Sequence, residues 1–100
     1  MSETVYSISK IKSLLQPVFS NYNIKKAVLF GSYAKGVAAK NSDVDILVDS
    51  GLKGQAFFGL LEDVVTALDK NVDMLDVSQI TPDSLVDKEI AESGVLIYGQ

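Results

Sequence analysis

The chain of 100 residues contains no cysteine, no histidine and no tryptophan, and all nine of its basic residues are lysines. The absence of cysteine excludes disulfides, thiolate catalysis and zinc–thiolate sites. The absence of histidine removes the commonest general base and the commonest zinc ligand, so any proton abstraction falls to a carboxylate, a lysine or water. Because the chain has no arginine, it cannot offer a phosphate the bidentate fork of a guanidinium group.

Clustered positive charge and long apolar runs are absent as well. The net charge is −4 and the sequence pI is near 4.6, which argues against broad binding to a nucleic-acid backbone. No apolar run approaches the length of a membrane span, and the first residues lack the charged-then-apolar layout of a signal peptide. We therefore expect a cytoplasmic protein without membrane attachment. A mean hydropathy of +0.21 is high for so small a chain and indicates a buried partner surface.

Hydrophobic periodicity predicts helices that alternate with strands. We expect one domain over residues 1–100, with an α/β or α+β fold in which helices cover a small mixed sheet. The predicted elements are a helix capped by Ser7 that reaches Phe19, strands at 26–30, 43–48, 71–76 and 95–98, a loop at 51–54, a helix over 57–68, and a helix that begins at Thr81–Pro82 and ends at Gly94. Pro17 is expected to kink or break the first helix.

The most informative stretch runs from Gly31 to Asp45, between two predicted strands. Asp43 and Asp45 are two positions apart on a strand and therefore share a face. Two carboxylates side by side repel, so such a pair needs a cation, a raised pKa or full exposure. A divalent metal satisfies the pair most directly, and hard oxygen ligands suit Mg²⁺ or Mn²⁺. Gly31, Ser32 and Gly36 form a predicted loop whose backbone can approach phosphates.

A third carboxylate, Asp73, lies between apolar neighbours in the predicted strand at 71–76. If this strand pairs beside the first two aspartates, the three carboxylates form a triad on one face. Each feature also has an ordinary alternative, because glycine and serine form common turns and aspartates decorate solvated strands.

Two further groups of side chains have two possible roles each. Four lysines are expected to gather around the motif and meet one nucleotide, or else to be ordinary surface residues. They are Lys25, Lys26, Lys35 and Lys40. Phe57 and Phe58 are adjacent, so both cannot point inward, and one of them is expected to line a nucleotide pocket or a protein interface.

These residues resemble a known signature. Gly31-Ser32, Gly36, Ser42-Asp43-Val44-Asp45 and Val72-Asp73 look like the motifs of the polymerase-β-type nucleotidyltransferase superfamily, and of its smallest members, the MNT (minimal nucleotidyltransferase) domains. The resemblance covers nearly the whole chain and implies a nucleotidyltransferase fold. It implies a nucleotide site at Gly31, Ser32, Lys35, Gly36 and Ser42, two Mg²⁺ ions, or Mn²⁺, at Asp43, Asp45 and Asp73, and help from Asp73 in activating the attacking hydroxyl. Many relatives carry arginines in the glycine-serine turn, where this chain has Tyr33 and Lys35.

The resemblance also implies a biological role. MNT domains of this size are often encoded with a HEPN-domain ribonuclease toxin and act as its antitoxin, in several cases by adenylylating a tyrosine of the toxin. The implied activity is metal-dependent transfer of AMP from ATP to a protein hydroxyl, within a hetero-oligomer and without stable nucleic-acid binding. The alternative is a non-catalytic module that binds nucleotide and neutralises its partner by occlusion. An aminoglycoside-modifying enzyme is a weaker alternative, because such relatives need an additional helical domain for the sugar.

Overall fold

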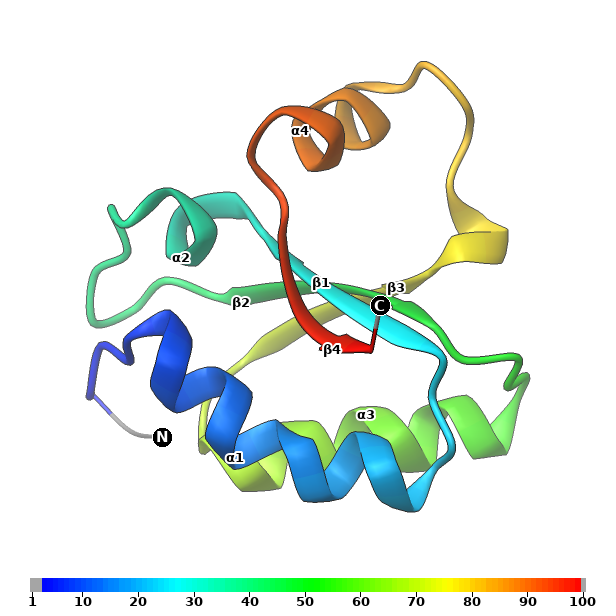
Figure 1. The fold of residues 1–100 in the computed structure, drawn as a ribbon. Coiled ribbons are helices and arrows are strands. Elements are labelled where there is room, and N and C mark those ends of the chain that lie inside the picture. The colour runs from blue at the N-terminus through cyan, green and yellow to red at the C-terminus, as the bar shows by residue number, and fades with distance from the viewer. Residues whose placement is uncertain (1–2, 100) are drawn as a thin grey trace.

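The computed structural model describes residues 3–99, and in it a mixed sheet lies between two groups of helices (Figure 1). The elements are, in chain order, α1 (Ile8–Asn21), β1 (Lys26–Phe30), α2 (Gly31–Lys35), β2 (Val44–Asp49), α3 (Gln55–Leu68), β3 (Val72–Asp76), the short 3₁₀ helix η1 (Val77–Gln79), α4 (Leu85–Ser93) and β4 (Val95–Gly99). None of the helices in this part of the chain is long and apolar enough to cross a membrane.

The sheet has four strands in the order β3-β2-β1-β4. β1 runs antiparallel to both β2 and β4, whereas β2 and β3 are parallel and are joined by α3. The predicted α/β fold with a small mixed sheet under helices is therefore confirmed. The parallel pairing of β2 with β3 matters most for function, because it brings the aspartates of two distant motifs to the same level of the sheet.

The core lies between the sheet and the two long helices, α1 and α3 (Figure 1). Helix α1 buries Ile11, Leu15 and Phe19 completely, because a spacing of four residues keeps these side chains on one helical face. On β2 the alternate residues Val44 and Ile46 are buried against the helices, so Asp45 and Leu47 belong to the opposite face. Helix α4 lies over that second face and has no buried residue.

The start of α1 is as predicted, but its interior is not interrupted by a break. The Ser7 hydroxyl accepts a hydrogen bond from the backbone N–H of Lys10 at 3.0 Å, as a helix cap should. The helix continues through Pro17 to Asn21. Proline leaves the carbonyl of Ser13 without its helical donor, but Ser13 and Pro17 both lie on the exposed face, where water can satisfy that carbonyl.

The predicted start of the last helix was wrong by three residues. Pro82 lies in a turn, and α4 begins at Leu85 with Ser84 as its cap. Asp83 has a φ of 63°, in the left-handed region, which stops any helix that starts at Pro82. The side chain of Asp87 stabilises this turn by accepting a hydrogen bond from the Asp83 N–H at 2.9 Å. The predicted end of the helix at Gly94 and the strand that follows are confirmed.

Candidate functional site

Asp45 and Asp73 lie side by side on the face of the sheet that points away from α1 and α3. In the parallel pairing of β2 with β3, Asp45 is directly opposite Asp73. Asp45 is half-buried and Asp73 is exposed. Asp43 lies one residue before β2, is exposed, and still contributes to the electrostatics at Asp45. The structure thus places Asp45 beside Asp73, with Asp43 near enough for its charge to act on Asp45.

The electrostatics of this cluster are unfavourable for a bare carboxylate. Burial raises the pKa of Asp45 to about 6, and the negative charges of Asp73, Asp43 and Glu89 add to that rise. Glu89 comes from α4 and was not anticipated. A group of acids that repel one another this strongly is a place where a cation is stabilised. A raised pKa at Asp45 is one of the three outcomes expected for the pair.

The predicted phosphate loop after β1 is instead a helix. Residues 31–35 form the single turn of α2, which begins directly at the end of β1. Gly31 has a φ of 72°, and a Cβ atom at this position would overlap Oδ2 of Asp45. Only glycine therefore lets the chain turn out of β1 while the Asp45 carboxylate lies against its backbone. Gly36 ends α2 in the left-handed conformation, as predicted for the end of the turn.

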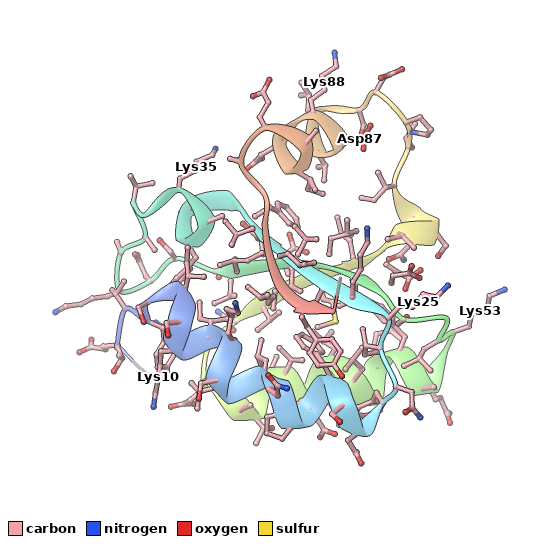
Figure 2. The ribbon with its side chains drawn as sticks, in the orientation of Figure 1. Lys10, Lys25, Lys35, Lys53, Asp87 and Lys88 are labelled. Carbon is pink, nitrogen blue, oxygen red and sulfur yellow. The ribbon has the colours of Figure 1, made fainter. Side chains whose placement is uncertain are left out.

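Lys35 is held by the acid from α4. Its Nζ lies 3.3 Å from Oε2 of Glu89, and both side chains are partly exposed. Figure 2 shows Lys35 on α2, on the side of the sheet where α4 lies. The predicted phosphate-binding cation is thus already paired, and Glu89 links α2 to α4 beside Asp45. Nothing in the sequence marks Glu89 for this position, because its place depends on how α4 packs on α2 and β1.

Ser42 has a structural role in the loop before β2. Its hydroxyl accepts a hydrogen bond from the Ala39 N–H at 2.9 Å, and its own N–H donates to the Ala39 carbonyl at 3.0 Å. These two bonds close a tight turn directly before Asp43. The carbonyl of Lys40 in the same turn accepts a hydrogen bond from Nζ of the buried Lys70. A nucleotide-binding role for Ser42 stays a prediction.

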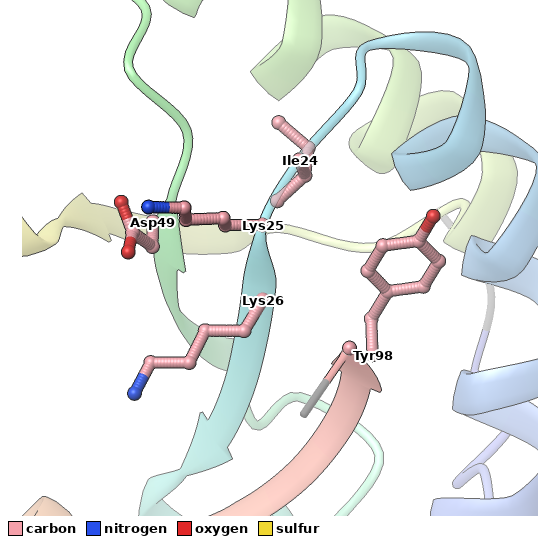
Figure 3. Close-up of a pocket in the computed structure, with 6 residues that line it drawn as sticks. Ile24, Lys25, Lys26, Asp49 and Tyr98 are labelled. Carbon is pink, nitrogen blue, oxygen red and sulfur yellow. The ribbon is translucent and has the colours of Figure 1, made fainter.

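The predicted gathering of four lysines was wrong for two of them. Lys25 and Lys26 lie at the far end of β1, where Lys26 is opposite Asp49. Figure 3 shows them with Asp49 and Tyr98 around a separate cavity of about 560 Å³. Residues rise about 3.3 Å each along a strand, so Lys26 is roughly 13 Å from Phe30, the partner of Asp45.

The adjacent phenylalanines diverge as expected. Phe57 packs against the core, whereas the side chain of Phe58 is 64% exposed. Both line a cavity of about 390 Å³ with Leu52 and Met74, at the start of α3. Met74 belongs to the helix-covered face of the sheet, so this cavity and the aspartates are on opposite faces.

The donor set at Asp43, Asp45 and Asp73 fits a hard divalent cation, because all of its ligands are carboxylate oxygens. The missing Cβ of Gly31 also leaves room for the Asp45 carboxylate beside the α2 backbone. Within residues 3–99, however, no three acidic side chains are grouped tightly enough to hold an ion in the arrangement seen. The three-carboxylate metal site therefore stays a prediction.

Comparison with known proteins identifies the family. The family described as "Polymerase beta, Nucleotidyltransferase" matches residues 10–100. The chain belongs to this nucleotidyltransferase family. Membership confirms the predicted resemblance and the predicted class of enzyme.

Individual relatives carry more specific names. A Methanocaldococcus jannaschii protein with the name "Putative protein adenylyltransferase" is 34% identical over 79 residues, which cover 76% of this chain and 84% of that one. The protein adenylyltransferase MntA of Shewanella oneidensis is 32% identical over 73 residues, covering 71% of this chain and 51% of MntA. A solved toxin–antitoxin complex with AMP-PNP contains a chain with a TM-score of 0.75 and 25% identity, covering 89% of this chain and 73% of that one.

Proposed function

We propose that this nucleotidyltransferase is a protein adenylyltransferase, which transfers AMP from ATP to a hydroxyl of a protein partner. The partner is a HEPN-domain toxin, the acceptor is one of its tyrosines, and the transfer makes this chain the antitoxin. The observation that carries the proposal is the alignment of Asp45 with Asp73 beside the Gly31 turn. The names of the two relatives and the toxin–antitoxin complex with AMP-PNP support it.

In the proposed reaction, Asp73 acts on the acceptor hydroxyl, whereas Gly31 and Ser32 contact the triphosphate. The acceptor oxygen forms a bond to the α-phosphorus of ATP, the bond from that phosphorus to the pyrophosphate oxygen breaks, and pyrophosphate leaves. Asp73 is exposed and can accept a hydrogen bond from the acceptor hydroxyl and take its proton. Gly31 and Ser32 place backbone next to the triphosphate. Mg²⁺ or Mn²⁺ held by the carboxylates would neutralise charge on the phosphates.

The first test is nucleotide binding. Removing Asp43 or Asp45 takes ligands from the cation while the phosphate charge remains, so ATP should bind at least about tenfold more weakly in Mg²⁺. Calorimetry on Asp43→Ala and Asp45→Ala measures this effect. Asp49→Ala is the matched control, since Asp49 shares the strand and the face of Asp45 but lies four positions along. Undiminished affinity in both site variants would remove the metal site from the proposal.

The second test separates chemistry from binding. Asp73→Asn keeps the shape of the side chain but cannot take a proton, so transfer should fall by roughly 10²-fold while nucleotide binding persists. The assay is incorporation of labelled AMP into the co-expressed partner, with a pull-down of the same partner alongside. A wild type that binds its partner tightly and never labels it would favour the alternative, neutralisation by occlusion.

A further inference from the structure

The face of the sheet that carries the aspartates also carries a row of apolar residues. A level of the sheet is a set of residues paired with one another across neighbouring strands. The apolar row occupies one level across all four strands, and this level lies two residues along from the level of Asp45 and Asp73. Register places Leu47 beside Leu75 on one side and beside Val28 on the other, and Val28 is paired with Leu96. Since strand residues rise about 3.3 Å each, this row begins about 7 Å from the carboxylates.

Part of this row forms the floor of a groove. Leu47 lines a cavity of about 270 Å³ together with Val77 of η1, Ile80 and Pro82 of the following loop, and Asp87 of α4. The groove therefore lies between the sheet and the segment from η1 to α4. Figure 1 shows that segment, coloured yellow to orange, rising from the end of β3 to α4. The carboxylate of Asp87 accepts the hydrogen bond from Asp83 in the adjacent turn. The walls are otherwise apolar.

Apolar side chains at and near the groove are exposed to solvent. Val77 is 37% exposed, and Leu85 at the start of α4 is 86% exposed. Apolar side chains that stay in contact with water beside a polar site mark a surface that another molecule covers. An apolar groove does not suit a triphosphate or a sugar, both of which need hydrogen-bond partners. The groove begins at the level next to Asp73, the carboxylate assigned above to the acceptor hydroxyl, so an occupant from the acceptor side of the reaction fits this position.

We propose that this groove binds the acceptor segment of the protein substrate, with an apolar residue two positions from the hydroxyl-bearing tyrosine. In an extended chain, side chains two apart point the same way and lie about 7 Å from each other. This is the spacing between the level of Asp73 and the level of Leu47. A tyrosine over Asp73 thus places the side chain two residues away at the level of Leu75 and Leu47, beside the groove. The inference rests on the proposed function, and it adds a sequence preference for the acceptor.

The two other cavities described above do not fit this role. The cavity at Lys25 and Lys26 lies at the opposite end of β1, and the one at Phe58 borders the helix-covered face. Of the three cavities, the groove over Leu47 is the one that begins at the level next to Asp45 on the same face of the sheet. An acceptor bound at the Phe58 cavity would have to cross the sheet to reach Asp73, and one bound at Lys26 would have to run along most of β1.

The test follows backbone amide shifts of the isotope-labelled chain by nuclear magnetic resonance. One probe is the blocked pentapeptide Leu-Gly-Tyr-Gly-Leu, and its matched control is Ser-Gly-Tyr-Gly-Ser. The leucine peptide should shift the amides of Leu47, Val77 and Ile80 saturably, with an affinity roughly tenfold above that of the serine peptide, because it buries an apolar side chain. Val77→Ser and Ile80→Ser should remove that advantage, whereas Phe58→Ser should retain it.

Addition of Mg²⁺ and ATP to the same sample distinguishes failure of the acceptor groove from failure of the proposed function. Shifts around Gly31 with ATP, but none in the groove with either peptide, would overturn the acceptor groove and leave the proposed function intact. Absence of both sets of shifts would count against both. Equal binding of the two peptides, shifts that cluster at Phe58, or a dimer of this chain that Val77→Ser dissociates would each also overturn the acceptor groove.

Discussion

Asp76 at the end of β3 offers the sharpest test of how the acceptor side of the site is held in place. The residue is 6% exposed, and its two carboxylate oxygens accept hydrogen bonds from different segments. Oδ1 accepts hydrogen bonds from the N–H and the hydroxyl of Ser50, at 3.1 and 2.5 Å. Oδ2 accepts from the N–H and the hydroxyl of Ser78, at 3.0 and 2.7 Å. The carboxylate therefore ties the end of β2 to η1, which carries Val77.

Asp76→Asn changes one of these two oxygens into an amide nitrogen. The serine hydroxyl facing that nitrogen can rotate and accept a hydrogen bond, but the backbone N–H beside it cannot. One partly buried N–H loses its acceptor and the remaining hydrogen bonds lose their charged partner, which together cost about 2 kcal/mol of the free energy of unfolding. For a domain of this size such a loss lowers the melting temperature by roughly 8 to 16 °C. Glu92→Gln is the control, because Glu92 is exposed on α4 and loses the same charge.

The pH dependence has a definite sign. Burial would raise the pKa of Asp76, but the hydrogen bonds from Ser50 and Ser78 outweigh it and hold the pKa below its ordinary value. A carboxylate with a lowered pKa in the folded state contributes stability that is present above its unfolded pKa and is lost as pH falls through its folded pKa. Thermal melts should therefore show a gap between wild type and Asp76→Asn that is constant near neutrality and narrows below about pH 4. Equal melting temperatures for Asp76→Asn and Glu92→Gln at pH 7 would refute this account.

Three further outcomes are expected. Tyr33 is 3% exposed and its hydroxyl has no hydrogen-bond partner among residues 3–99, so Tyr33→Phe should raise the free energy of unfolding in urea by about 1 kcal/mol, and a loss of stability would reveal a hidden partner. Glu89→Gln frees Lys35 for phosphate, so calorimetry should show ATP binding up to about fivefold tighter, and unchanged affinity would mean that Lys35 does not meet the nucleotide. Gly31→Ala should abolish ATP binding because its Cβ has no room, while Gly36→Ala, with open space around it, should cost only about 1 kcal/mol of stability; equal effects would contradict the close approach at Gly31.

Local signals in the sequence were enough to place the strands and the aspartates. Alternation of apolar and polar residues predicted β2 and β3, and it also predicted that Asp45 faces away from Val44. The sequence predicted that Asp73 joins Asp45 only if their two strands pair, since no local pattern determines which strands are neighbours. The turn after β1 was predicted as a loop because a helix of one turn has almost no propensity signal of its own. Its start is determined by Gly31 and by the packing of α2 against β1 and β2.

The lysines show why nearness in sequence misled the prediction of charge around the site. Lys26 is only five residues from Gly31 in the sequence. Residues 26–30 form a strand, however, and the extended backbone of a strand places its two ends far apart. Glu89 is 44 residues from Asp45, yet its charge acts on that carboxylate because α4 folds back over the sheet. The charges around Asp45 are thus determined by where α4 packs. Under the proposed function, a partner that covers the exposed Leu85 of α4 and shifts this helix would change the pairing of Lys35 with Glu89, and nucleotide affinity would become linked to partner binding.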